Sequence, residues 1–376
     1  MLKRNFYFIL LIGVFFACKN ANKTDYPVLS VNLSQMNTPS LFDIFEKIEI
    51  IPLETTDSSL IGGPANNIEF YNSHYYIFDG PTESLYCFDE HGKFVRKIGN
   101  KGPGPQEYIF VTDFVINNHN DVVELLSPFG FLYVYELSGK FVGRTKLPNI
   151  VPNYQEIMLL NDSLRILMSS TESNQDQLYV YSTRSNTIIN SFYKENPAIF
   201  DFNPKSFYQY NGSIYFYKPL ISKVFKVNQH GYEVAYSWNF GALNPERTKL
   251  DKDVTNERLE DMFKNSQIKG IYNCQYQNDN YYYTRYNRIV NQDLYDPLYT
   301  NVIYDKRNNK AFVFEKFKED LYFFPTFWDN DYVLSASHIY IKKSVDPSVL
   351  DEENRNKLKA IKEDDNPFII KYYFKK

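Results

Sequence analysis

The amino-acid sequence predicts an all-β fold, a six-bladed β-propeller with small helical insertions. Three observations lead to this prediction. The 376 residues include 31 Phe and 33 Tyr, and aromatic and β-branched side chains suit the half-buried surfaces of sheets. A pattern of strand, Asn or Asp turn and second strand occurs six times. One further strand pattern near each end of the chain has no neighbour of its own, so these two can complete one blade together.

The repeated unit has the length expected of one propeller blade. Its first strand ends in a turn, and a strand rich in Tyr, Ile or Leu follows directly. Successive turns are 46, 43, 50, 67 and 51 residues apart, and repeats of about 40–50 residues are typical of four-stranded blades. The six turns are centred on Asn72, Asn118, Asn161, Asn211, Asn278 and Asp329.

The second half of the unit is a further hairpin, as in residues 84–99 and 131–147, with Gly or Asn where the turn needs a positive φ. Two charged segments, 244–267 and 347–364, predict inserted helices. The sixth unit lacks a fourth strand. We expect the strand at residues 45–55 to supply it by joining the C-terminal strand, which closes the ring without an open edge.

The first residues form a targeting segment. Lys3 and Arg4 precede an apolar run, Phe6–Phe16, which is too short to span a bilayer. Ala17 and Cys18 follow, and a small residue directly before a cysteine resembles a bacterial lipoprotein signal peptide, whose cysteine is lipidated. A signal peptide cleaved elsewhere and an uncleaved anchor are the alternatives. The predicted organisation is a signal peptide over 1–17, lipidation at Cys18, a polar tether over 18–40 and the propeller domain over 41–376.

Composition restricts the partners that the chain can have. Charged residues make up 23% of it and the formal net charge is −4, without a cluster of Lys and Arg, so we expect no nucleic-acid partner. Five histidines without short spacing predict no metal site, and no motif indicates a cofactor. Cys87 and Cys274 lie in separate apolar strand patterns, which favours buried free thiols over a disulfide.

From about residue 41 the chain resembles the six-bladed propeller lipoproteins of Bacteroidetes. The resemblance rests on IPLETTDSSLIG (51–62), GKFVRKIGNKGPGPQEY (92–108) and NPFIIKYYF (366–374), in this order behind the lipidation motif. The second stretch also resembles the crossover of the NHL repeat. The resemblance implies a propeller fold and membrane contact through a lipid anchor, and it carries no agreed activity. We therefore expect an outer-membrane lipoprotein that faces either the periplasm or the exterior.

Residues 97–108, KIGNKGPGPQEY, contain a glycine-rich loop that invites comparison with phosphate-binding loops. Such a loop opens a helix whose N–H groups face the anion. Here a strand pattern follows, and no Lys-Ser or Lys-Thr pair comes after the last glycine. We interpret the loop as the crossover from the outer strand of the first blade to the inner strand of the second.

We expect the ligand site on the face that carries the long connections, including 99–108, 244–268, 286–297 and 340–366. Long loops on a rigid scaffold often carry function, and the central channel opening there is the expected pocket. Tyr and Arg would suit a sugar or a peptide through stacking and forked hydrogen bonds, although strand packing explains the same residue types. The candidate ligand-binding residues are Asp79, Tyr108, Asp113, Arg285, Tyr286 and His338.

The sequence leaves three functions open. The leading one is a lipid-anchored, noncatalytic binding or scaffold module for a glycan, a peptide or a protein partner, because the common catalytic motifs are absent. The alternative is a glycan lyase or hydrolase with its site at the channel mouth, whose turnover would depend on Arg285 or His338. An acid pair such as Glu107 and Asp113 could transfer protons, although such pairs arise by chance among 45 carboxylates. A sensory or assembly role in an envelope complex is the third. No residue is assigned a catalytic role.

Overall fold

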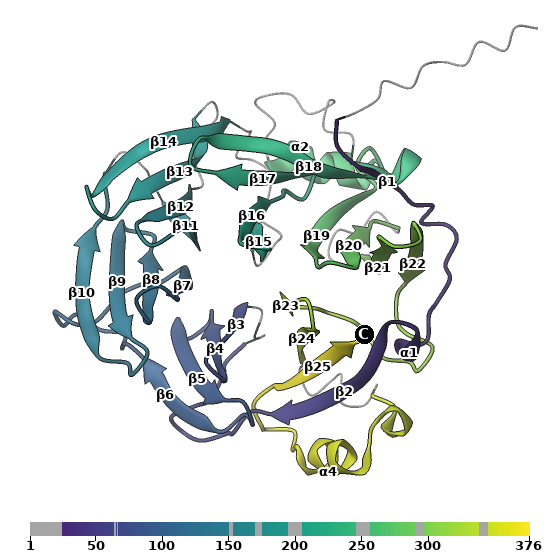
Figure 1. Cartoon of the computed structure of the whole chain (residues 1–376), viewed down its shortest axis with the longest axis horizontal. Coiled ribbons are helices and arrows are strands. Elements are labelled where there is room, and N and C mark those ends of the chain that lie inside the picture. Colours follow the sequence, from purple (N-terminus) through teal and green to yellow (C-terminus); the bar gives the residue numbers. More distant parts are fainter. Residues whose placement is uncertain are drawn as a thin grey trace, which may run out of the picture.

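A computed structural model describes residues 25–63, 65, 67–149, 153–169, 175–194, 205–245, 256–290, 297–337 and 345–376. Within this part of the chain, six sheets are arranged as blades around a central axis (Figure 1). The predicted six-bladed β-propeller is therefore confirmed. The predicted signal peptide and Cys18 lie outside the described residues.

The first three blades follow the chain from the axis outward, so the innermost strand of each comes first. Neighbouring strands in each of these blades are antiparallel. The first blade contains β3 (Asn67–Tyr71), β4 (His74–Asp79), β5 (Ser84–Asp89) and β6 (Phe94–Ile98). The second contains β7 (Asp113–Asn117), β8 (Val122–Ser127), β9 (Phe131–Glu136) and β10 (Phe141–Lys146). The third contains β11 (Tyr154–Leu159), β12 (Leu164–Ser169), β13 (Asp176–Ser182) and β14 (Thr187–Lys194).

The fourth and fifth blades repeat this order, whereas the sixth takes its outermost strand from the start of the chain. The fourth blade contains β15 (Phe207–Tyr210), β16 (Ser213–Phe216), β17 (Lys223–Asn228) and β18 (Gly231–Asn239). The fifth contains β19 (Gly270–Gln277), β20 (Tyr281–Arg288), β21 (Leu298–Asp305) and β22 (Lys310–Phe314). The sixth contains β23 (Phe327–Trp328), β24 (Tyr332–Ser337), β25 (Phe368–Phe374) and β2 (Phe45–Pro52).

All six turns expected from the repeats join the first and second strands of a blade. Two of them show why Asn and Gly occur there: Asn72 with Ser73, and Asn211 with Gly212, have positive φ at both residues. This geometry matches the twist of the flanking strands in a two-residue hairpin. We call the side of the ring on which these six turns lie the tight-turn face.

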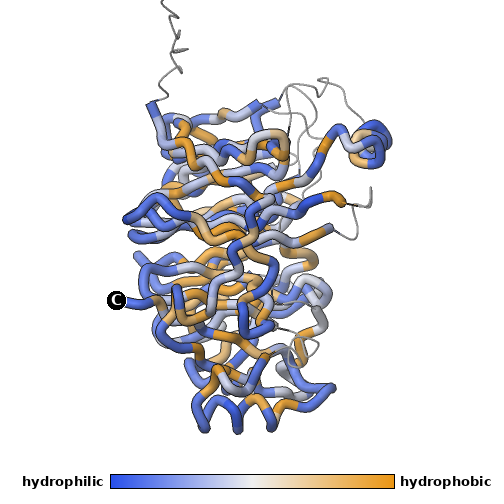
Figure 2. Tube along the Cα trace, turned by 90° about the vertical axis from the view of Figure 1, so that its right-hand side faces the viewer, coloured by the Kyte–Doolittle hydropathy of each residue, from blue (hydrophilic) through white to orange (hydrophobic). Residues whose placement is uncertain are grey.

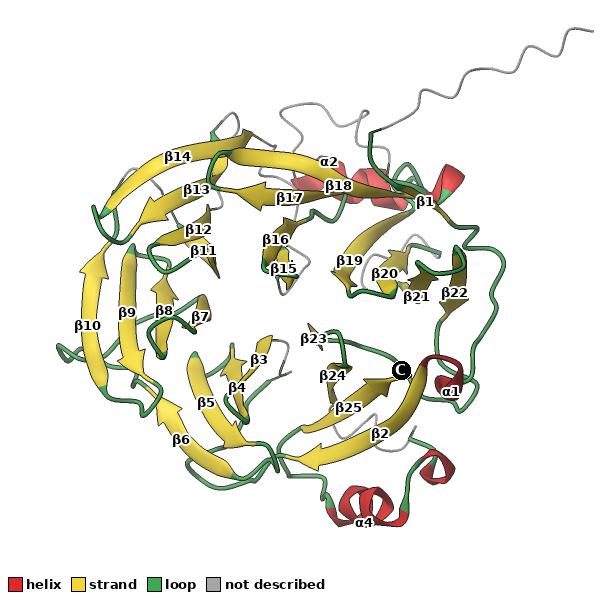
Figure 3. Cartoon of the chain, viewed as in Figure 1, coloured by secondary structure: helices red, strands yellow, loops and turns green. Residues whose placement is uncertain are grey.

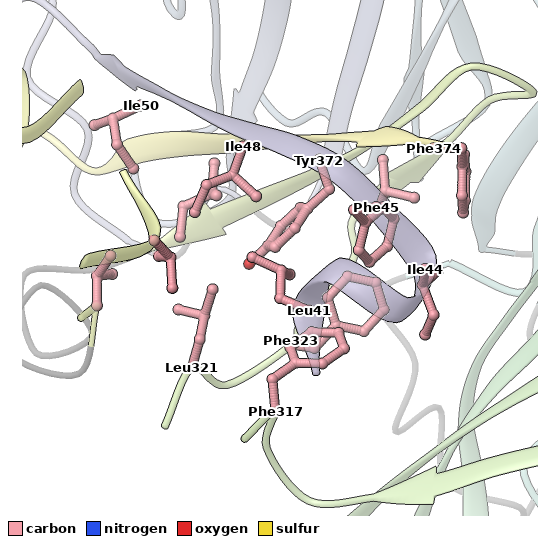
Figure 4. Packing of buried hydrophobic residues seen from close by; sticks show 14 of the residues in the cluster. Leu41, Ile44, Phe45, Ile48, Ile50, Phe317, Leu321, Phe323, Tyr372 and Phe374 are labelled. Carbon is pink, nitrogen blue, oxygen red and sulfur yellow. The ribbon is translucent and has the colours of Figure 1, made fainter. Parts of the chain in front are cut away.

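The ring is closed as predicted, by antiparallel pairing of β2 with β25. Phe45, at the start of β2, is fully buried. Its ring centroid lies 5.0 Å from that of Phe374 and 5.2 Å from that of Tyr372, both on β25. Figure 4 shows these rings together with Phe317 and Phe323 in one apolar cluster. The ends of the chain are thus joined by side-chain packing as well as by strand pairing.

An additional strand, β1 (Val28–Ser30), pairs in parallel with β18 at the outer edge of the fourth blade. Leu29 and Leu33 are buried against this blade. Further along, Asn37 exchanges hydrogen bonds with the backbone of Ala311 and Val313 in the fifth blade. We call residues 28–40 the strap. The predicted start of the folded domain at residue 41 is therefore too late, because the second half of the expected tether packs on two blades.

Helices lie where the charged segments predicted them. The helix α2 (Asn256–Lys264) belongs to the first segment, and α4 (Glu352–Ala360) follows a 3₁₀ turn, η3 (Pro347–Val349), in the second. Figure 3 shows α4 outside the ring beside β2, and Asn354 accepts a hydrogen bond from the Ile50 N–H on that strand. A short helix, α1 (Leu41–Ile44), precedes β2, and a 3₁₀ turn, η1 (Gly241–Leu243), follows β18.

The apolar core is divided among the spaces between neighbouring blades. One cluster, for example, joins Tyr76 and Leu85 of the first blade to Phe114 and Leu125 of the second. In the edge-on view of Figure 2, hydrophobic segments run through the interior and hydrophilic ones gather at the periphery. Cys87 and Cys274 are buried free thiols, as predicted. None of the helices in the described ranges is long and apolar enough to cross a membrane.

Candidate functional site

A cavity of about 730 Å³ follows the propeller axis, and all six innermost strands contribute to its lining. At one end it reaches the tight-turn face, where Asn118, Asn161 and Asn211 line it. At the other end its lining includes Asn67, the first residue of β3, and Lys205, two residues before β15. We call this space the channel cavity. Its volume lies in the range typical of pockets for small molecules.

We call the end of the channel cavity away from the tight-turn face its inner end. Four charged side chains gather there and form what we call the channel ion cluster: Glu69, Asp113, Glu156 and Lys205. Lys205 belongs to the fourth blade, and its Nζ lies 3.4 Å from Glu69 Oε1 in the first blade. The same Nζ lies 3.7 Å from Asp113 Oδ1 in the second blade. Because the first and fourth blades lie on opposite sides of the ring (Figure 1), Lys205 bridges the channel.

The carboxylates of this channel ion cluster also tie each blade to the next. Asp113 accepts hydrogen bonds from the Asn67 side chain at 2.9 Å and from the Ile157 N–H at 3.0 Å. Glu156 accepts the Ser206 N–H with both oxygens, at 3.0 and 2.8 Å. Four consecutive blades are thus held in register around the inner end of the cavity. Such cross-links favour a cavity that is formed before any ligand arrives.

The local environment shifts the proton affinities of these groups. Burial raises the pKa of Glu69, and burial together with the nearby Asp113 carboxylate raises the pKa of Glu156 to about 7. Burial alone would lower the pKa of Lys205, but the carboxylates of Asp113, Glu69 and Glu156 outweigh it and raise this pKa above its ordinary value. Lys205 therefore stays charged at neutral pH, whereas Glu156 exchanges its proton in that range.

Two tyrosines that line the cavity occupy matching places in opposite blades. Tyr71 directly precedes the turn of the first blade, and Tyr210 directly precedes the turn of the fourth. The Tyr71 hydroxyl donates to Asp121 of the second blade at 2.7 Å, and the Tyr210 hydroxyl donates to Asp279 of the fifth at 2.7 Å. Both distances are optimal for O–H···O bonds, so each ring is held in place by a neighbouring blade.

Of the six residues predicted to bind a ligand, Asp113 is the one that belongs to the channel ion cluster. Its side chain is buried and bonded to protein groups, so it supports the cavity and does not itself line it. Glu107, which we paired with Asp113 as an acid couple, accepts a hydrogen bond from the Gly104 N–H at 2.9 Å within its own loop. This loop, 97–108, connects β6 to β7, which confirms its interpretation as a crossover.

Three other candidates are fully buried and contact other parts of the protein: Asp79, Tyr108 and Tyr286. Asp79 accepts hydrogen bonds from the Gly62 N–H and the Thr82 hydroxyl, which anchors the loop before β3. Tyr108 packs in the apolar cluster between the first two blades, and the Tyr286 hydroxyl donates to the Leu243 carbonyl. Their predicted role in ligand binding stays untested, and their burial gives each a structural role.

Arg285 is half-buried and donates from Nε to Asn273 Oδ1 at 3.0 Å. Its guanidinium lies 5.0 Å from the ring centroid of Phe324 and 5.9 Å from that of Tyr299, so cation–π contacts hold it between blades. His338 lies outside the described residues. Parts of the long-connection face also lie outside the described residues, so the predicted site on that face stays a prediction. One of its predicted helices, α4, packs on the outer edge of the ring.

Sequence reasoning missed Glu69, Lys205, Tyr71 and Tyr210. The two tyrosines carried a usable signal, since each directly precedes a predicted turn at the channel. Glu69 and Lys205 carried none that fixes their pairing, because they lie 136 residues apart. Among the described residues, no group of three His, Cys, Asp or Glu side chains is arranged to hold a metal ion.

The chain belongs to the family described as "Domain of unknown function (DUF4934)", whose model matches residues 27–373. It is similar to the solved structure of a "Putative exported protein" from Bacteroides fragilis, with a TM-score of 0.75 and 19% identity over 93% of this chain and 100% of that one. A DUF4221 family member from Bacteroides vulgatus matches 88% of this chain and 97% of its own, with a TM-score of 0.55 and 10% identity. These similarities show the fold alone. A search of the curated proteins found no match.

Proposed function

We propose that this member of the DUF4934 family is a noncatalytic binding module of the cell envelope whose ligand enters the channel cavity from the tight-turn face. The observation that carries the proposal is the channel cavity itself, which all six blades line and which reaches the exposed turns. A glycan, a peptide or a segment of a partner protein is the class of ligand that such a cavity takes.

The contacts between blades support a binding role. Lys205, Asp113 and Glu156 join the first four blades at the inner end of the cavity, and the Tyr210 hydroxyl joins the fourth blade to the fifth. A wall fixed in this way loses little conformational freedom when a ligand binds, which favours affinity. The carboxylates among these residues are bonded to neighbouring blades, which supports a structural rather than a catalytic role for them.

An envelope location is supported by the start of the chain and by the similar protein described as exported. The apolar run to Phe16 followed by Ala17 and Cys18 fits a lipoprotein signal, and the similar structure from Bacteroides fragilis carries the word "exported" in its description. We propose a lipid anchor at Cys18, as in the NHL-like propeller lipoproteins that the chain resembles. Changing Cys18 to Ser should abolish incorporation of a labelled fatty acid in cells, and labelling that persists would refute the anchor.

The binding role can be tested by blocking the cavity. Gln209 is exposed, lines the cavity and has an ordinary negative φ, so Gln209→Trp should fill the mouth without unfolding the blade. Gln35→Trp introduces the same change at an exposed position of the strap and serves as the control. Thermal unfolding of the full chain would be recorded with pools of glycans, peptides and partner-derived segments. A ligand at about 100 times its Kd stabilises the fold by about 2.7 kcal/mol.

We expect at least one pool to stabilise the wild type and the Gln35→Trp variant, but not the Gln209→Trp variant. The ligand should be recovered chemically unchanged after prolonged incubation, as judged by its mass. Stabilisation that survives Gln209→Trp would move the site away from the channel cavity. Turnover of the ligand would replace the binding module with the glycan lyase or hydrolase that the sequence leaves open.

A further inference from the structure

The lining of the channel cavity is rich in rings and amides. Of the 27 lining residues in the described part of the chain, eight are aromatic and seven are Asn or Gln. Aromatic faces pack against the C–H surfaces of a polyol ring, and a side-chain amide both donates and accepts hydrogen bonds, as a hydroxyl group does. Rings combined with amides therefore match a ligand that has apolar faces and neutral hydroxyl edges.

The ionised groups of the cavity are largely satisfied within the protein. Glu69 and Lys205 are paired with each other at 3.4 Å. Asp329 accepts a hydrogen bond from the Asp331 N–H within its own turn. The described lining holds no other Lys, Arg, Asp or Glu. A strongly charged ligand would give up its hydration without meeting an unpaired partner, which is unfavourable, so this lining favours a neutral ligand.

The backbone around the cavity favours a sugar over an extended peptide. Each innermost strand lies at the end of its sheet, so its second edge has no strand partner in the described part of the chain. These six edges surround the axis (Figure 1). An extended peptide can pair with one such edge along its length. The sugar rings of an oligosaccharide, by contrast, direct hydroxyl groups outward on several sides, so they can reach several edges at once.

Tyr71 and Tyr210 add fixed ring surfaces on opposite sides of the mouth. Their hydroxyls are occupied by Asp121 and Asp279 in the neighbouring blades, which limits rotation of the rings. Both side chains are only half-buried and line the cavity. Rings that are held in place before binding contribute stacking at a low entropic cost.

We infer that the channel cavity binds a neutral oligosaccharide, stacked against Tyr71 and Tyr210 and hydrogen-bonded by the amide side chains of the tight-turn face. This inference rests on the proposed function, because it names the ligand class of the same cavity.

The test is titration calorimetry of the full chain, kept in a detergent without a sugar headgroup. The probes are maltohexaose, xylohexaose and mannohexaose as neutral oligosaccharides, hexagalacturonate as an acidic one, and an end-blocked hexapeptide pool. The variants are Tyr71→Ala and Tyr210→Ala, with Tyr71→Phe and Tyr210→Phe retaining the rings. Tyr299→Ala is the matched control, since Tyr299 is 40% exposed on β21 and lies outside the cavity lining.

We expect at least one neutral hexasaccharide to bind more tightly than hexagalacturonate and the peptide pool. Each Tyr→Ala change should weaken it roughly tenfold, which corresponds to the loss of one stacking contact. The Tyr→Phe variants should stay within about threefold of the wild type, and Tyr299→Ala should match it. Tryptophan emission gives a second readout, because Trp328 lines the cavity whereas the other tryptophan, Trp238, does not and is bonded to Gln275.

Two results would overturn the inference in different ways. If none of the neutral sugars binds at about 10 mM while the peptide pool or hexagalacturonate binds and responds to Tyr71→Ala, the cavity is a binding site for another ligand class, and only the proposed function survives. If a sugar binds and the Tyr→Ala variants behave like Tyr299→Ala, the sugar lies elsewhere, and the cavity loses both assignments.

Discussion

Replacing Glu156 with glutamine should remove a pH dependence of stability that the channel ion cluster creates. Burial, with the nearby Asp113 carboxylate, raises the pKa of Glu156 from 4.5 to about 7 in the folded protein. Between these two values the folded protein holds a proton that the unfolded chain has released. The contribution of Glu156 to stability is therefore fully present below pH 4.5 and is lost as the pH rises through 7. Between pH 5 and 8 this loss amounts to about 2.5 kcal/mol.

The assay is urea denaturation of the full chain at pH 5 and at pH 8. Glutamine keeps one side-chain oxygen to accept the Ser206 N–H, so Glu156→Gln should fold. The wild type should lose about 2.5 kcal/mol of unfolding free energy more than Glu156→Gln over this interval. Glu233→Gln removes an exposed carboxylate on β18 and should follow the wild type at both pH values.

Parallel behaviour of the wild type and Glu156→Gln between pH 5 and 8 would refute the reasoning. It would mean that Glu156 is ionised in the folded protein and that the inner end of the cavity is more hydrated than its burial indicates. If Glu156→Gln lost more unfolding free energy than the wild type between pH 5 and 8, the pKa of Glu156 would be lowered rather than raised. This result would contradict the placement of the Asp113 carboxylate beside it.

Three further changes test the architecture by urea denaturation. Phe45→Ala should lower the free energy of unfolding by about 3–5 kcal/mol, because it leaves a cavity in the cluster that joins the two ends of the chain. Phe42 is 39% exposed on α1, so Phe42→Ala should stay within about 0.5 kcal/mol of the wild type. Equal effects of the two changes would contradict the closure. Arg165→Met should cost about 3–5 kcal/mol, since it leaves the buried Glu124 without its ion-pair partner at 2.6 Å, and a neutral result would mean that water reaches this pair. Leu33→Ala should cost about 3 kcal/mol if the strap belongs to the folded domain, and no change would return it to the status of a tether.

The number of blades and the closure of the ring could be predicted because they depend on local patterns. An Asn turn between two apolar strands specifies a hairpin wherever it occurs, and Asn72 and Asn211 adopt the positive φ that this requires. Strand patterns without neighbours at the two ends leave few ways of completing the sixth blade, and β2 pairs with β25 accordingly.

The strap shows a signal that was present and missed. Leu29, Val31 and Leu33 alternate with polar residues, which is the pattern of a half-buried strand. Its polar surroundings favoured a tether instead. The structure pairs this segment with β18 and buries the three apolar side chains.

The sequence by itself determined the blades, their turns, the closing strand and the buried thiols, because each follows from patterns within a few residues of one another. The channel cavity was decided by the tertiary structure. Which side chains reach the axis depends on how each blade is rotated within the ring, and Lys205 meets Glu69 only because the fourth blade stands opposite the first. The same side chain at the same place in the sequence would be an exposed charge in an isolated hairpin. In the ring of six blades, it bridges opposite sides of the cavity.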